Sequence, residues 1–137
     1  EATPMETFAL GKTFKGHLMP VTSLEIHPKK PVIATASDDN TWKLWSVPNG
    51  ELIMSGEGHK DWVAGIAFHP SGTQLASASG DCTVKLWDFE VAKCSVTFTD
   101  HTQAVWDVAF HDTGDFMASC SLDHSDACGT CGRRSAK

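Results

Sequence analysis

The chain repeats itself every 42 residues. Histidines, aspartates and valines recur at that step, and residues 16–57 match residues 58–99 at 13 of 42 positions without a gap. A gap-free register over three units indicates a repeat architecture, in which each unit buries its apolar faces against its neighbours. The recurring residues are His17, His59 and His101; Asp39, Asp81 and Asp123; Val21, Val63 and Val105; His27, His69 and His111; and Trp45 with Trp87.

The local pattern inside each unit predicts β-strands. Runs rich in β-branched and aromatic residues begin at Val21, Val63 and Val105, and each ends in a turn. Small residues then alternate within 31–37, 74–79 and 116–121, and two further alternating segments cover 41–46 and 83–88. Since no window of 12 residues carries a helical apolar stripe, we expect an all-β fold with roughly four strands per unit. The predicted turns are 28–31, 48–50, 70–72 and 112–114.

Composition argues against several classes of function. The chain has 11 Lys and Arg against 17 Asp and Glu, a net charge of −6, which disfavours nucleic-acid binding because that affinity comes from cations that meet phosphates. No apolar run approaches the ~20 residues of a membrane span, and residues 1–6 do not resemble a signal peptide. The five cysteines are odd in number and three lie near the C-terminus, a pattern that fits a reducing, cytoplasmic compartment.

Two short motifs recur at the same step. Gly-His at 16–17 and 58–59 is followed by Leu-Trp-Ser at 44–46 and Leu-Trp-Asp at 86–88. These motifs and their spacing resemble the WD-repeat (WD40) β-propeller family over residues 7 to 125. The resemblance implies repeat 1 over 16–57, repeat 2 over 58–99, a partial repeat 3 over 100–125 and a divergent Cys/Gly/Arg tail over 126–137. Residues 1–15 are expected to be a linker with the outer strand of a preceding blade, at Phe8–Phe14.

The resemblance also implies a structural role for the recurring polar residues. In a blade of this family a His, a Ser or Thr, an Asp and a Trp form a hydrogen-bonded tetrad, and these side chains can satisfy one another in the interior. A Ser-His-Asp set also resembles a catalytic triad, but three copies at a fixed period indicate a scaffold, so we expect no catalytic residue. The matching residues are His17, Thr35, Asp39 and Trp45; His59, Ser77, Asp81 and Trp87; and His101, Ser119 and Asp123, where the Trp is missing.

The third unit departs from the pattern after Leu122-Asp123-His124-Ser125. Residues 126–137 contain no large apolar residue where a strand similar to AKLWD should stand. We therefore expect that the third strand of this unit does not form as it does in the other two. A closed propeller has about four to eight blades, so three units are expected to complete a ring only within a longer chain.

Partner binding is expected on the face where the first strand of each blade begins. In this family, the residues on either side of the conserved Val and the residue before the turn Asp point to that face. Trp62 and Trp106 are the strongest candidates, since Trp is over-represented in binding hot spots; alternatively, one or both could pack in the interior or be exposed without a partner role. The further candidates are Pro20, Asp38 and Leu122, with Thr22, Ala64, Gly80 and Ala104 at the matching positions of the other units.

Cys120, His124, Cys128 and Cys131 form a weak zinc candidate. Their residue types suit zinc, but one Cys-x2-Cys is only half of the usual structural site. The competing interpretation is a strand cysteine, a turn histidine and two thiols of the tail. We expect no bound metal and no cofactor.

These observations favour a non-catalytic scaffold for protein–protein contacts. The strings FKGHLMPVTSLEIHP and GHKDWVAGIAFHPSG are similar to the WD-repeat proteins of the central apparatus of cilia and flagella. That similarity implies central-pair partners and a place in the axonemal cytoskeleton, in support of motility. The alternative is a substrate-recognition adaptor, as in ubiquitin ligation or phosphopeptide reading. Phosphate readers use clustered arginines, and the chain has Arg only at 133 and 134, in the tail.

Overall fold

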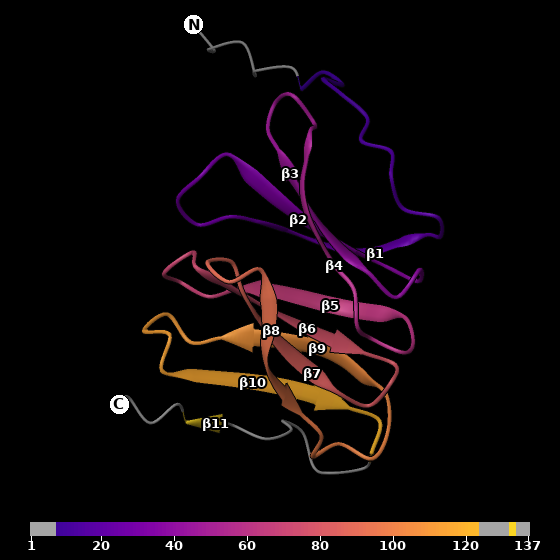
Figure 1. Ribbon diagram of the computed structural model, residues 1–137, viewed down its shortest axis with the longest axis vertical. Helices are drawn as coiled ribbons and strands as arrows, with labels where there is room; N and C mark the ends of the chain where they lie inside the picture. The colour runs from indigo at the N-terminus through magenta and orange to yellow at the C-terminus, as the bar shows by residue number, and fades with distance from the viewer. Residues whose placement is uncertain (1–7, 124–131, 134–137) are drawn as a thin grey trace, which may run out of the picture.

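The computed structural model describes residues 8–123 and 132–133, and it confirms the all-β prediction. The described residues form three antiparallel sheets and no helix (Figure 1). Blade 1 contains β1 (Val21–Ile26), β2 (Val32–Ser37), β3 (Trp42–Ser46) and β4 (Leu52–Gly56). Blade 2 contains β5 (Val63–Phe68), β6 (Gln74–Ser79), β7 (Val84–Asp88) and β8 (Lys93–Phe98). Blade 3 contains β9 (Val105–Phe110), β10 (Phe116–Ser121) and β11 (Gly132–Arg133).

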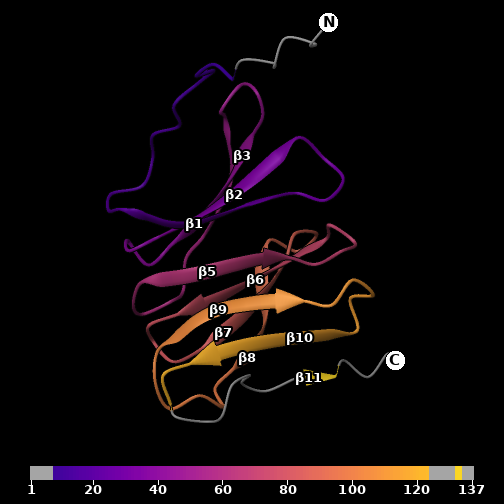
Figure 2. The ribbon, with the colours of Figure 1, turned by 180° about the vertical axis from the view of Figure 1, so that it is seen from behind.

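The blades stack on one another in chain order. Strand order within blades 1 and 2 follows the sequence, so each is a simple meander of neighbouring antiparallel strands. Strand β5 contacts β1 and β2 of the blade before it, and β9 contacts β5 and β6 in the same way. Figures 1 and 2 show the three sheets following one another down the long axis of the molecule. The fold is therefore a propeller fragment of about three blades, with the last one truncated.

Large residues of one blade pack on small residues of the blade before it. Ala34 and Ala36 on β2 are fully buried in one cluster with Val63, Ile66 and Phe68 on β5. Burial of each of these three side chains contributes about 1.5–3 kcal/mol to stability. The next interface repeats the arrangement 42 residues later, with Ala76, Ala78, Val105 and Val108 in a second cluster.

The first blade exposes the face that the second blade buries. Val21, Leu24 and Ile26 on β1 occupy the positions of Val63, Ile66 and Phe68 on β5. Their exposed fractions are 52%, 61% and 71%, whereas the residues on β5 are 7% exposed or less. An apolar face at the first blade is what the repeat architecture predicts where no preceding blade is packed.

One predicted strand is absent from the structure, and the third strand of blade 3, which the sequence predicts not to form as in the other units, departs from their register. The outer strand expected at Phe8–Phe14 is absent, because these residues have no strand beside them with which to pair; Phe14 stacks on Trp45 instead, with ring centroids 5.9 Å apart. In blade 3 the expected strand positions near 126–130 lie outside the described residues. The two residues of β11 pair with Phe116 and Met117, three positions later than the register of β7 would place them.

Each blade contains a chain of hydrogen bonds between recurring polar side chains. In blade 2, Trp87 Nε1 donates to Ser77 Oγ over 2.8 Å, and that hydroxyl lies 2.7 Å from His59 Nε2. Because the carboxylate of Asp81 can only accept, the proton of the neutral imidazole lies on Nδ1, 2.9 Å from Asp81 Oδ2, and Nε2 accepts from the Ser77 hydroxyl. Blade 1 has the same chain through Trp45, Thr35, His17 and Asp39. Blade 3 has it through Ser119, His101 and Asp123, with the Trp position outside the described residues.

The aspartates at the ends of the chains in blades 1 and 2 are held as carboxylates. Burial acts to raise the pKa of Asp81, but hydrogen bonds from Thr83, the amide of Lys60 and His59 outweigh it and lower the pKa to about 2. In blade 1, burial opposes hydrogen bonds from Thr41, His17 and Leu18, which lower the pKa of Asp39 further. Burial lowers the pKa of His59, against the effect of Asp81, and so favours the neutral imidazole of the chain described above.

A second set of histidines links one blade to the next, a role that the sequence analysis did not assign. His27 Nδ1 accepts the amides of Lys29 and Lys30, each at 3.0 Å, so its Nε2–H donates to Gly72 O of blade 2 over 2.9 Å. His69 repeats the link, with Nε2 3.1 Å from Gly114 O of blade 3. Gly72 has a positive φ of 78°, and a Cβ there would lie 2.5 Å from the His27 ring. The recurrence of this histidine every 42 residues is the sequence feature that could have indicated the inter-blade link.

Blades 1 and 2 fill one cross-strand position with opposite residue sizes. Trp42 pairs with Gly56 across β3 and β4, whereas Val84 pairs with Phe98 at the same position of blade 2. A Cβ on Gly56 would lie 2.0 Å from Trp42 Cε2. The large side chain therefore stands on the third strand in blade 1 and on the fourth strand in blade 2.

The tetrad geometry predicts that Asp81→Ala destabilises the chain. The variant leaves His59, Thr83 and the Lys60 amide without their acceptor, so the free energy of unfolding should fall by about 2–4 kcal/mol. Chemical denaturation followed by circular dichroism measures this. Asp115→Ala, an exposed turn aspartate, is the control and should change it by less than about 0.5 kcal/mol. Equal stability of the two variants would contradict the role of Asp81.

The same carboxylate predicts a pH dependence. The folded pKa of Asp81 is lowered from its ordinary value of 3.8 to about 2, so the stability that it contributes is present above about pH 4 and is lost as the pH falls through about 2. The difference in unfolding free energy between the wild-type chain and Asp81→Ala should therefore shrink from pH 5 to pH 2. A difference that stays constant over this range would show that the carboxylate form is not what stabilises the fold.

The opposite residue sizes at this cross-strand position predict that Gly56→Ala is destabilising and that changes at positions 42 and 56 are coupled. The added methyl group collides with Trp42 and should lower the free energy of unfolding by about 1–3 kcal/mol. Trp42→Val with Gly56→Phe copies the pair of blade 2 and should cost less than the sum of its two single changes. A double-mutant cycle by chemical denaturation tests this, and strict additivity would refute the coupling.

Candidate partner-binding face

The predicted partner-binding positions lie at one edge of the blades, where the first strands begin. In each blade, the residue before the first strand accepts a hydrogen bond from the turn that follows the second strand. The amide of Asp38 donates to Pro20 O over 3.0 Å, Gly80 to Trp62 O over 2.8 Å and Leu122 to Ala104 O over 3.3 Å. The structure therefore brings the two groups of predicted positions together in every blade.

Trp62 and Trp106 lie against each other although they belong to different blades. Their ring centroids are 4.8 Å apart and the ring planes are inclined by 42°. The two residues meet because one precedes β5, the other follows the first residue of β9, and the inner strands β5 and β9 are neighbours. The sequence analysis chose both residues but did not predict their contact, which the adjacency of inner strands in successive blades could have suggested.

The pair has one half-buried member and one exposed member. Trp62 is half-buried, and its ring covers Gly80, where a Cβ would lie 2.4 Å from Trp62 Cε2. Trp106 is 48% exposed. The competing expectation that these tryptophans pack in the interior therefore does not hold for Trp106. A supported indole beside an exposed one offers an aromatic, apolar surface of the kind found at binding hot spots.

The other candidate positions are more dispersed. Pro20 and Leu122 are exposed, and Asp38 is half-buried. Pro20 and Asp38 belong to the edge of blade 1, and Leu122 belongs to the edge of blade 3. The Trp62–Trp106 pair is thus the part of this edge for which the structure shows a built aromatic contact.

Acidic side chains line a cavity between the inner strands. The cavity has a volume of about 500 Å³ and is bordered by Glu25, Asp107 and Asp112 together with apolar residues of β5 and β9. Burial and the nearby Asp107 raise the pKa of Glu25. Among the described residues, no group of three His, Cys, Asp or Glu side chains is arranged to hold a metal ion.

The zinc candidate falls mostly outside the described part of the chain. Cys120 is an exposed free thiol on β10, and His124, Cys128 and Cys131 lie beyond the described residues. Cys82 and Cys94 are further free thiols of the described residues. A search of residues 8–123 and 132–133 finds no helix that could span a membrane.

Comparison with known proteins follows the same repeats. Residues 8–46, 48–88 and 92–125 match the family described as "WD domain, G-beta repeat". The second match contains β4 of blade 1 and β5–β7 of blade 2, and the third contains β8 of blade 2 with β9 and β10 of blade 3, so each of these two matches spans two neighbouring blades.

The curated relatives include proteins of flagella and sperm. A flagellar WD repeat-containing protein, Pf20, from Chlamydomonas reinhardtii is 60% identical over 60 residues, which are 44% of this chain and 10% of that protein. Sperm-associated antigen 16 protein from Mus musculus is 42% identical over 55 residues, 40% of this chain and 9% of that protein. Pre-mRNA-processing factor 19 from Bos taurus is 40% identical over 48 residues, 35% of this chain and 10% of that protein. The matched segments span about a tenth of these relatives. With three family matches over most of its length, the chain belongs to the WD-repeat family.

Proposed function

We propose that this chain is a non-catalytic scaffold that binds another protein through the Trp62–Trp106 pair. The observation that carries the proposal is the contact of these two indoles at 4.8 Å on the edge where β5 and β9 begin, with Trp106 exposed. Tightly bonded turns support this edge, because the hydroxyls of Ser37 and Ser79 donate to the carbonyls of the loops that precede β1 and β5. A rigid aromatic patch loses little conformational entropy when a partner binds.

The polar side chains of the blades support a structural role over a catalytic one. His59 and Ser77 are buried, and each is bonded to further members of its tetrad. The hydroxyl of Ser77 accepts from Trp87 and is thereby fixed inside the blade. The same arrangement occurs in the other blades, whereas a reacting centre would be expected once and open to substrate.

We further propose that the scaffold acts in cilia or flagella, on the axonemal cytoskeleton. The support is the identity with a relative named as a flagellar protein and with relatives named as sperm-associated. Central-pair components of the axoneme are the partners that this context suggests. A substrate-recognition adaptor is the second candidate, because Pre-mRNA-processing factor 19 and a Lissencephaly-1 homolog are 40% and 43% identical to the chain, about the level of sperm-associated antigen 16 protein.

The proposal predicts that the Trp62–Trp106 pair controls partner retention. Trp106→Ala removes the exposed indole and should reduce the retention of axonemal proteins from a flagellar extract by about tenfold or more. Trp62→Ala should do the same, because it removes the support for Trp106. The immobilised full chain is used as bait, and retained proteins are quantified by mass spectrometry after chemical cross-linking to the bait.

Leu52→Ala provides the matched control. Leu52 is an exposed apolar residue on β4, so its loss should leave retention unchanged if the tryptophan pair is the contact. Thermal melts of all three variants separate lost binding from lost folding. Equal retention by wild type and both tryptophan variants would overturn the proposed contact, and retention of non-axonemal proteins alone would overturn the ciliary context.

A further inference from the structure

The outer face of blade 3 repeats a surface that is buried inside the stack of blades. Ala118 and Cys120 on β10 hold the positions of Ala76 and Ala78 on β6, 42 residues earlier. The two alanines of β6 are fully buried against blade 3, whereas Ala118 is half-buried and Cys120 is exposed. A hollow of about 170 Å³ is lined by Ala109, Ala118 and Cys120, among others. These three residues are called the β10 face below.

The opposite end of the stack carries side chains that fit such a surface. Val21, Leu24 and Ile26, called the β1 face below, are all exposed. They hold the positions of three β9 residues that pack in one cluster with the alanines of β6, namely Val105, Val108 and Phe110. The two ends of the chain therefore present the two halves of an interface that the chain already builds twice between its own blades.

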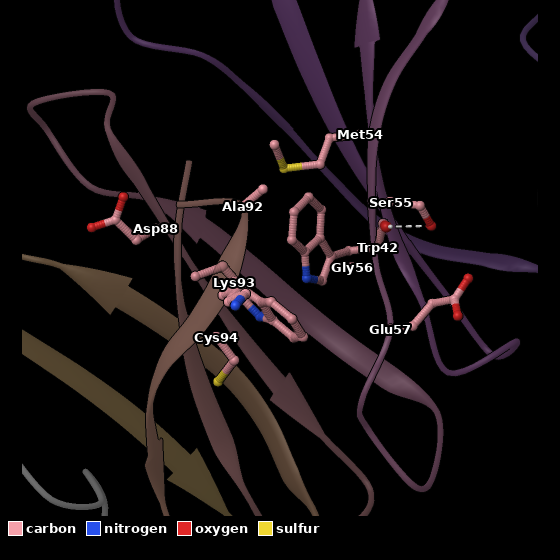
Figure 3. A pocket seen from close by; sticks show the side chains of 10 residues that line it. Trp42, Met54, Ser55, Gly56, Glu57, Asp88, Ala92, Lys93 and Cys94 are labelled. Carbon is pink, nitrogen blue, oxygen red and sulfur yellow. Dashed lines mark hydrogen bonds between the residues drawn. The ribbon is translucent and has the colours of Figure 1, made fainter. Parts of the chain in front are cut away.

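The strands that blade 3 retains are the ones that form these interfaces. Within the stack, β5 packs on β1 and β2, and β9 packs on β5 and β6, all of them first or second strands of their blades. Farther out the sheets separate, and a cavity of about 340 Å³ remains between β3–β4 and β7–β8. Figure 3 shows this cavity with Met54 and Ser55 of β4 on one side and Lys93 and Cys94 of β8 on the other. Strands β9 and β10 thus present a receiving surface, although among the described residues only the two of β11 follow them.

We propose that two copies of this chain pack head to tail, with the β1 face of each copy on the β10 face of the other, and close a ring of six blades. A second copy is the occupant that the chain itself specifies, because it brings a matching face to both free ends at once. Closed propellers have about four to eight blades, so three blades cannot close alone, whereas three from each copy can. A head-to-tail contact that closes leaves no free end, so the assembly stops at two copies.

The turns beside the two faces have opposite charges. At the interface of blades 2 and 3, Gly114 O lies 3.1 Å from His69 Nε2. The same placement in the pair of copies puts Lys30, at the position of Gly114, beside His111 and Asp112 of the other copy. The ammonium group and the carboxylate attract each other. Lysine fills the space that glycine leaves for the histidine ring, so the histidine link is not reproduced, and we expect the contact to be reversible.

Sedimentation equilibrium of the full chain tests the proposal. A thiol reductant is present throughout, because Cys120 is an exposed free thiol. The mean mass should rise with concentration from that of one chain to that of two and should stop there. The mass of one chain at every concentration up to about 1 mM, or a mass that rises past two chains, would overturn the closed pair.

Charged substitutions decide which faces meet. Leu24→Glu places a carboxylate in the β1 face, and Cys120→Lys places an ammonium group in the β10 face. Both positions are exposed in the single chain, so circular dichroism should show unchanged folding. Each variant alone should raise the dissociation constant about tenfold or more, since both contacts of its ring then bury an unpaired charge. An equal mixture should recover the paired mass, because one contact is native and the other joins the two opposite charges.

Val91→Glu is the matched control. Val91 is an exposed apolar residue in the turn between β7 and β8, so this change should leave the dissociation constant as it is in the wild-type chain. Undiminished pairing by either face variant alone would overturn the head-to-tail arrangement, since a contact between two like faces spares one of the two variants. A mixture that pairs no better than its separate components would overturn it as well.

Discussion

The packing of large side chains on a bed of small ones is the constraint on which the rest of this structure depends. Ala34 and Ala36 leave room for β5 to approach β2, and Ala76 and Ala78 leave the same room for β9. The inner strands of successive blades therefore become neighbours. Residues that are far apart in the chain, such as Trp62 and Trp106, meet as a direct result.

Polar groups in such tightly packed blades must find hydrogen-bond partners within the protein. Two sets of recurring histidines provide them, one within a blade and the other between blades. His59 carries hydrogen bonds along its own blade, from Trp87 through Ser77 to Asp81. His27 carries one across the interface to Gly72 of the next blade. One set therefore stabilises the individual sheet and the other fixes the stacking of sheets, and both need the 42-residue period to stay in register.

Much of this arrangement could be predicted from the sequence because each element recurs. The strands, the turns and the polar residues of the tetrads occupy equivalent places in each unit, so an element identified in one unit predicts the matching element in the others. Features that occur once were not accessible in this way. The outer strand expected at Phe8–Phe14 depended on a neighbouring strand that is not beside it. The Trp42–Gly56 pair becomes visible only when the cross-strand register is known and is compared with Val84–Phe98.

The stacking order also divides the molecule energetically. Blade 2 has a packed neighbour on both sides, whereas blades 1 and 3 each have one in the described structure. In a linear array the stability of a unit is its own folding energy plus that of its interfaces, so the middle blade is held by two couplings and the outer ones by one. Local stability therefore decreases from the middle blade toward both outer blades. Local opening should start in the outer blades, and the amide protons of β5 and β6 should exchange last.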